Sequence, residues 1–522
     1  MSSWGACRVA WVVCSIVLAW PLSSLGQPNA AGRIRDLIQG LSYDEARLAM
    51  GPFDPNSREM GLERARLALY ELDCDAAAAW FDTDHPPSGS EAEWLAQAAD
   101  GCRRVIAATL VDRDEQRAIE IRWQDDSDRV LAPWIFDVVA KARDALSRDL
   151  GVDWPLPTRI VVVRDLWSLS AMTALPYRSA QTTGTVAVAK WGRVTLLSPR
   201  ATPHGYPWLD TLAHELTHLA VTRATGDKAP LWLQEGVAKR QEVRWRQPGP
   251  FDGRPPADAV ARRGFEVGLG IPLDRLGPSI AMLPSADAAR VAFAEVTSFV
   301  EFFAAEQPTA ALPSLLGALG TGKDTDEALV AASGQDLAWW NRHWRTKLAS
   351  EIGEPLPLDS DVGSRPDRDT RALWNGVRLA QLLAHRGHTA VALERLDAAL
   401  GDHGQAAKAS RVEVPDDPNL GWLRARLLEE LDRSDEAMRV VDDPQMVSAS
   451  FGPWWAERGR LAKSFGRDAV AGQSFAQALS VDPLDEASAC GAMAESDAVA
   501  DGERQRLCDA ARAASGPSFD AD

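Results

Sequence analysis

The sequence predicts an α+β protein in which a region with a small mixed sheet is flanked by α-helical regions at both ends. Two observations predict this order. Apolar residues recur at helical spacing up to about residue 115, give way to short alternating and β-branched runs between residues 118 and 198, and then return to helical spacing. In addition, a helical pattern with a repeated period fills the chain beyond residue 370.

Composition narrows the class of protein. A chain of 522 residues is long enough for several domains, and 46% hydrophobic with 25% charged residues is typical of a soluble globular protein. The formal net charge of −18 disfavours binding to nucleic acid, so we expect no nucleic-acid partner.

Residues 1–26 are predicted to be a signal peptide. Arg8 precedes an apolar run at residues 9–20, and Ser24 and Gly26 supply small residues at the −3 and −1 positions of a cleavage site. The protein is therefore expected to be exported, either periplasmic or secreted. The run is shorter than the roughly 20 residues of a membrane span. The alternative is an uncleaved N-terminal anchor. Apart from that anchor, we expect no attachment to a membrane.

Four cysteines remain after the signal, in two local pairs: Cys74 with Cys102, and Cys490 with Cys508. Each pair falls in a helical region. In an oxidising compartment an even number of paired cysteines predicts two disulfides, each joining a helical hairpin. The alternative is four buried free thiols.

Residues 27–115 are expected to form a small helical domain, with helices at 60–73 and 91–105 and a loop at 85–90 between them. Residues 116–350 form the region with the sheet. We expect four strands, at 118–123, 159–164, 183–189 and 193–198, with helices at 130–150 and 166–175 between them, and later helices at 288–306, 312–319, 326–332 and 337–348.

A helix predicted at residues 208–223 carries the pattern H-E-x-x-H at His214, Glu215 and His218. Residues four apart lie on the same face of a helix, so both imidazoles can bind one zinc ion. Glu215 follows the first ligand and can act on the metal-bound water as a general base. Asp210 near the start and Gly226 after the end are typical helix boundary residues.

A third ligand follows on the next predicted helix, where Glu235 lies among apolar residues. A catalytic zinc is held by three protein ligands and keeps a fourth position open. His214, His218 and Glu235 supply that number, so the sequence predicts one Zn²⁺ with Glu215 as the catalytic residue.

The stretch H-E-L-T-H, followed by P-x-W-L-x-E-G at residues 230–236, resembles the gluzincin branch of the zincin metallopeptidases. It is most similar to the peptidase MA-like domains of bacterial envelope proteins, over roughly residues 118–348. The resemblance implies a zincin-like fold for residues 116–350, with the zinc ligands and catalytic glutamate at the four residues named above.

The resemblance also implies features around the metal. An edge strand is expected to bind the substrate backbone, and residues 193–198 are our candidate. Related peptidases place an acidic residue four positions after the glutamate ligand, where this chain has Lys239, so support for the ligands is absent or comes from elsewhere. Phe293 takes the place where a tyrosine often lies.

Residues 351–369 are rich in Pro, Gly and Asp and are predicted to be an interdomain linker. Residues 370–522 resemble tetratricopeptide repeats, with small residues at matching positions and a 34-residue spacing between Ala437 and Ala471. The first gap between repeats is longer because of a charged insert at 401–418. A generic helical tail is the alternative.

His204 and Tyr206 precede the metal helix and are weaker candidates, either for a contact to a transition-state oxygen or for an ordinary loop pair.

Two functions fit the sequence. One is an exported zinc metallopeptidase, an endopeptidase by expectation, that hydrolyses peptides or proteins. The other is a non-catalytic envelope protein that binds a protein partner through its helical repeats and keeps a structural or vestigial zinc site. Glu215 favours the enzyme, since a purely structural site has no need of it.

Overall fold

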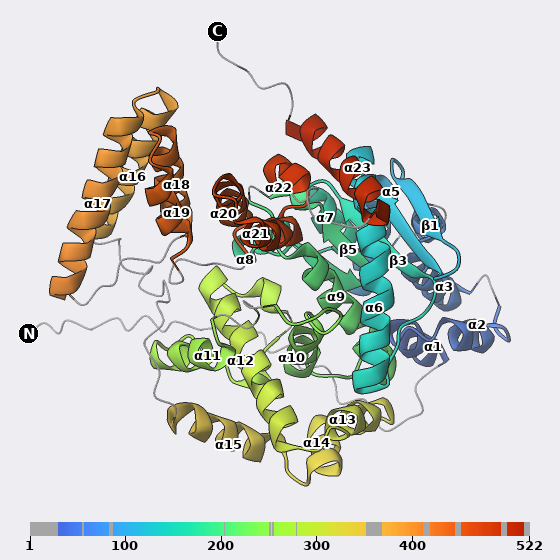
Figure 1. The fold of residues 1–522 in the computed structure, drawn as a ribbon. Coiled ribbons are helices and arrows are strands. Elements are labelled where there is room, and N and C mark those ends of the chain that lie inside the picture. Colours follow the sequence, from blue (N-terminus) through green and yellow to red (C-terminus); the bar gives the residue numbers. More distant parts are fainter. Residues whose placement is uncertain are drawn as a thin grey trace, which may run out of the picture.

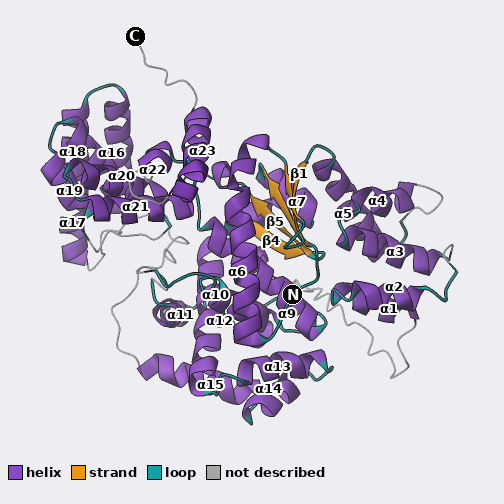
Figure 2. Cartoon of the chain, turned by 45° about the vertical axis from the view of Figure 1, so that its right-hand side comes forward, coloured by secondary structure: helices purple, strands orange, loops and turns teal. Residues whose placement is uncertain are grey.

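The computed structural model describes residues 30–515 except 55–56, 83–86, 203, 250–251, 253–254, 278, 351–367, 411–417, 444–449 and 492–497. The predicted signal peptide and most of the predicted linker lie outside these residues. The described part is mostly helical with one small mixed sheet, as the sequence predicts (Figures 1 and 2). None of the described helices is long and apolar enough to cross a membrane.

The sheet has five strands in the order β1-β2-β3-β5-β4. Strand β2 is parallel to β3 and β3 to β5, whereas β1 and β4 run antiparallel to their neighbours. The strands are β1 (Leu110–Asp114), β2 (Ile119–Trp123), β3 (Thr158–Val163), β4 (Ala187–Lys190) and β5 (Arg193–Leu197).

Three expectations about the sheet are wrong. Strand β1 lies among residues that were expected to be helical. The strand expected at 183–189 begins only at Ala187, because α8 (Tyr177–Thr183) ends at residue 183 and a short connection follows it. The edge strand next to the helix at residues 208–225 is β4 and not the expected β5, because β5 lies between β3 and β4. Residues 193–198 therefore cannot offer a free edge. Strand order depends on long-range pairing, which local sequence patterns do not encode.

Helices cover both faces of the sheet, and the β-branched run of β3 explains why. Ile160 and Val162 pack in one hydrophobic cluster with α6 (Ala132–Leu150) and α9 (Trp208–Thr225). Val161 and Val163 pack on the opposite face with α5 (Ser90–Ile106) and α7 (Leu166–Thr173). A strand that is buried on both faces has no polar alternation.

The N-terminal helices are α1 (Ala30–Gln39), α2 (Tyr43–Met50), α3 (Arg58–Tyr70), α4 (Cys74–Asp82) and α5. Both predicted cysteine pairs are disulfide-bonded. The first disulfide joins the start of α4 to α5. The sequence pattern predicted α3 and α5 but not the short helix α4 between them.

Helix α9 is followed by a helical layer that includes α12, which contacts α10 and α11 (Figure 1). Its members are α10 (Leu231–Gln241), α11 (Ala257–Glu266), the 3₁₀ turns η3 (Leu273–Arg275) and η4 (Ile280–Met282), α12 (Ala286–Glu306), α13 (Ala311–Gly320), α14 (Thr325–Ser333) and α15 (Leu337–Ser350). Of these, α11 was not expected from the sequence.

Three C-terminal hairpins share one turn geometry. The residues Gly387, Asp432 and Gly466 have positive φ angles, and each following amide donates a 2.9 Å hydrogen bond to the carbonyl five residues before it. The hairpins are α16 (Arg368–His385) with α17 (Thr389–Ser410), α18 (Pro418–Glu430) with α19 (Ser434–Val441), and α20 (Gly452–Ser464) with α21 (Asp468–Val481).

The hairpins stack on one another through a hydrophobic cluster of their own. The last pair, α22 (Glu486–Gly491) and α23 (Ala498–Ser515), is different. Leu484, Leu507 and Ala511 belong to the cluster that also holds α6 and α9. The end of the chain is therefore packed into the sheet-containing body, while α16–α19 stand away from it (Figure 1).

Glu295 provides a pH-dependent test of the packing around α12. Its carboxylate lies fully buried on α12 and accepts a hydrogen bond from the Ile271 amide. Burial raises the pKa of Glu295 to about 8, although Ile271 and Arg345 oppose the shift. Because the folded pKa exceeds the unfolded one, Glu295 binds a proton on folding, and stability falls as pH rises from about 4 to 8 by up to ~1.4 kcal/mol per unit.

We therefore expect Glu295→Gln to raise the melting temperature more at pH 8 than at pH 5. Glu301→Gln, an exposed change on the same helix, should show no such trend. Thermal unfolding curves at both pH values measure the difference. Parallel pH dependence of the Glu295→Gln and unsubstituted proteins would contradict the assignment.

Candidate metal centre

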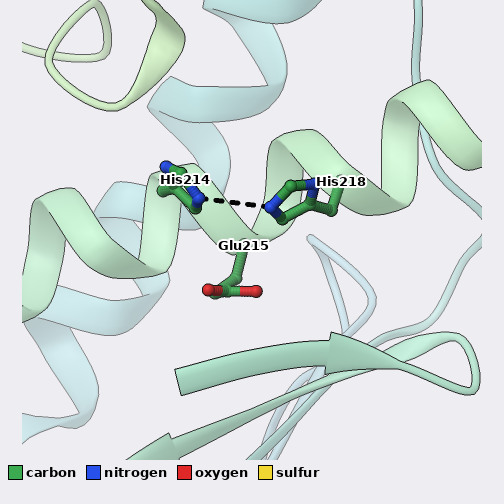
Figure 3. Close-up of side chains that lie close together, drawn as sticks. All are labelled: His214, Glu215 and His218. Carbon is green, nitrogen blue, oxygen red and sulfur yellow. Dashed lines mark hydrogen bonds between the residues drawn. The ribbon is translucent and has the colours of Figure 1, made fainter. Parts of the chain in front are cut away.

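Helix α9 places both motif histidines on one face (Figure 3). It ends as the sequence predicts, with Gly226 in a left-handed conformation and its amide bonded to the Thr222 carbonyl. Helix α10 follows after a short turn and packs against α9 and α12. Gly236 makes this packing close, since a Cβ at that position would lie 2.6 Å from the Val296 carbonyl oxygen. The packing of α10 against α9 brings Glu235 to the histidines.

The three predicted ligand atoms form a nearly equilateral triangle. His214 Nε2 and His218 Nε2 are 3.2 Å apart, and Glu235 Oε2 is 3.4 Å from each of them. A tetrahedral zinc with ligands at about 2.0–2.1 Å requires ligand–ligand separations of roughly 3.3–3.4 Å. The separations therefore fit a zinc ion that His214, His218 and Glu235 would hold.

Charge at the centre also suits a cation. Burial alone would lower the pKa of His214, but Glu235 and Glu242 outweigh it and raise that pKa to about 9. Burial would raise the pKa of Glu235, but the two histidines hold it well below its usual range. Carboxylates that stabilise positive charge on an imidazole also stabilise a divalent ion among them.

The outer nitrogen of each histidine faces an oxygen. His218 Nδ1 is 3.4 Å from Gln234 Oε1, and Gln234 in turn contacts Thr222 Oγ1. His214 Nδ1 is 3.4 Å from Glu242 Oε2, too loose for a formed hydrogen bond but close enough for a charge contact. Acceptors on this side favour a proton on Nδ1, which leaves Nε2 free to bind metal.

Glu242 supplies the support that position 239 does not. Lys239 donates a 2.6 Å hydrogen bond to Glu242 Oε1, so the lysine orients this carboxylate. Burial raises the pKa of Glu242, but Lys239 and His214 outweigh burial and lower it to about 2. Glu242 is the C-cap of α10, seven residues or two helical turns after Glu235, and it was not predicted because the family pattern specifies only the position four residues after the glutamate.

Glu215 lies between the histidines and the sheet (Figure 3). Its Oε2 accepts a 2.6 Å hydrogen bond from the Ala189 amide of edge strand β4. The side chain is mostly buried, with 8% exposed. A backbone donor fixes the carboxylate beside the ligands, and no side-chain motif could have predicted this bond.

Three further residues were considered from sequence. The Phe293 ring lies 6.3 Å from the His214 ring, so this residue does border the centre, with no polar group to offer. The Tyr206 hydroxyl donates to the Leu197 carbonyl, and the His204 ring packs 5.0 Å from Phe451. The hydroxyl of Tyr206 is thus bonded to the chain, while burial raises its pKa well above the usual value and the charges of Asp128 and Glu215 add to that shift, so Tyr206 lies near Glu215.

A scan of the chain against models of known protein families finds no match, and a search of curated proteins finds none. The resemblance to gluzincins therefore remains a prediction from the motif residues.

We expect Glu242→Gln to weaken zinc binding by about 10- to 100-fold, because the His214 imidazole loses the charge that orients it. Competition with a chromophoric chelator measures this affinity. Glu301→Gln is the matched control, since its carboxylate pairs with Arg240 and does not contact the ligands. Equal zinc affinity in both variants would show that Glu242 does not support the site.

Proposed function

We propose that this chain is an exported zinc-dependent peptidase, with His214, His218 and Glu235 as ligands and Glu215 as general base. The observation that carries the proposal is the ligand triangle with a fixed carboxylate beside it. A structural zinc site is closed by four protein ligands, whereas three ligands and an adjacent base are typical of a hydrolase.

When bound, zinc would supply a Lewis acid that lowers the pKa of a water molecule and polarises the substrate carbonyl. The residues of the chain do the rest. Glu215 Oε2 is held by Ala189, and Oε1 is available to take the proton of the attacking water and pass it to the leaving amine. Glu235 contributes the negative charge that balances the metal in a buried site.

Strand β4 supports a peptide as the substrate. The Leu197 amide donates to the Val186 carbonyl. The backbone N–H and C=O groups of every second residue, Val188 and Lys190 included, therefore point toward β5, while those of Ala187 and Ala189 point away from the sheet. The N–H and C=O groups of Ala187 and the C=O of Ala189 thus point toward the outer edge of β4, where an extended backbone would bind by strand addition. The two disulfides are compatible with export.

A second function, binding of a protein partner by the helical hairpins, is favoured by one observation. Hairpin α16–α17 stands away from the body and exposes the apolar side chains of Trp374, Leu382 and Val391. Hairpins with shared turns offer a continuous surface for a partner. Such binding is compatible with a peptidase, to which it would recruit substrates.

We expect Glu215→Gln to leave zinc binding roughly unchanged and to lower kcat/KM for peptide hydrolysis by about 10²- to 10⁴-fold, because the proton acceptor is lost. Zinc content and cleavage of a quenched fluorescent peptide library are measured on the same preparation. The Glu301→Gln protein controls for loss of a carboxylate. Hydrolysis by Glu215→Gln at the parental rate would refute the role of Glu215.

A further inference from the structure

The free edge of β4 is short and both of its ends are bridged. Only two residues, Ala187 and Ala189, turn their backbone groups away from the sheet. Four residues of strand span about 13 Å. What borders these 13 Å decides how long a peptide the edge can hold.

At the start of β4 a bridge leads across to the opposite side of the metal centre. Thr183, at the end of α8, donates a 3.2 Å hydrogen bond to the Ala281 carbonyl of η4. Turn η4 contacts α12 as well as α8, and its Ile280 is fully buried in the main core. Since α12 carries Phe293 next to His214, the chain closes around this end of the site.

At the other end, the turn between β4 and β5 is covered by the N-terminal helices. A Cβ on Gly192 would lie 1.8 Å from the Tyr43 hydroxyl and 3.2 Å from the Tyr70 carbonyl, so no space remains beside this turn. The same N-terminal segment reaches the end of the metal helix, where Ser42 accepts a hydrogen bond from Arg223. Gly40 also packs directly against Gly226.

These two bridges lie at opposite ends of the same edge. Figure 3 shows the strand hairpin beside Glu215 with its turn on the His218 side, toward the C-terminal end of α9. The N-terminal helices therefore close the His218 side, and α8 with η4 closes the other. A chain that extends along β4 therefore meets the contact between α8 and η4 near one end and the N-terminal helices near the other.

We infer that the site selects short, unstructured peptides and excludes interior segments of long chains. This inference rests on the proposed function and gives its substrate class. It narrows the expected endopeptidase to an oligopeptidase, because a short peptide ends before it meets either bridge. Turn η4 is then a determinant of substrate length.

Binding tests the inference separately from catalysis. Zinc-loaded Glu215→Gln protein is titrated with fluorescent peptides of about 6, 12 and 30 residues that share one central, unstructured sequence. We expect the shortest to bind at least about tenfold more tightly than the longest. Equal affinity across the series would overturn the inference, and so would the absence of binding by every peptide.

Two substitutions in η4 locate the barrier. Ile280→Ser removes the buried anchor of the turn, whereas Met282→Ser changes a half-exposed side chain of the same turn. We expect Ile280→Ser, with its fold checked by circular dichroism, to narrow the difference between the longest and shortest peptides to about twofold. Met282→Ser should keep the difference. Equal effects of the two would count against η4 as the barrier.

Hydrolysis by the unsubstituted protein completes the comparison. Cleavage of the short peptide with a kcat/KM at least about tenfold above that of the long one supports both proposals. Length-dependent binding without cleavage of any peptide would refute the peptidase and leave the inference about length standing. Cleavage of all lengths at equal kcat/KM would do the reverse.

Discussion

Two imidazoles and three carboxylates gather where α9, α10 and β4 meet, with His214 and Glu215 buried and the other three partly buried, and this burial constrains the structure around them. Removing ionisable groups from water is costly unless each is paired or bound to a metal. Here Glu235 lies between the two histidines, Glu242 faces His214 and Lys239, and Glu215 takes the Ala189 amide. The partners of the α9 side chains come from α10 with its C-cap and from β4, so the centre and the packing of these three elements depend on one another.

Local sequence predicts the part of this centre that lies on helices. His214 and His218 are four residues apart, and helix geometry alone places them together. Glu235 was found because a carboxylate among apolar neighbours needs a partner. Glu242 and Ala189 were not found, since the first lies seven residues after Glu235 and not at the position four residues on that the family pattern specifies, and the second acts through its backbone.

The sheet shows the same limit at a larger scale. The composition of β3 and β5 predicts strands, but which strand becomes the edge depends on pairing between distant residues. The prediction of residues 193–198 as the edge strand was wrong because the sequence does not show this pairing. The C-terminal hairpin turns differ in how plainly their residues indicate them: Gly387 and Gly466 occupy left-handed positions that glycine favours, whereas Asp432 occupies the equivalent position without a glycine.

The direct test of the account is the zinc content of the purified protein and of its His214→Ala, His218→Ala and Glu235→Ala variants, measured by elemental analysis with folding checked by circular dichroism. The account predicts about one equivalent of zinc in the unsubstituted protein and in the Glu301→Gln control, and loss of that zinc from each ligand variant. Folded, unsubstituted protein that binds no zinc, or ligand variants that all retain it, would contradict the account.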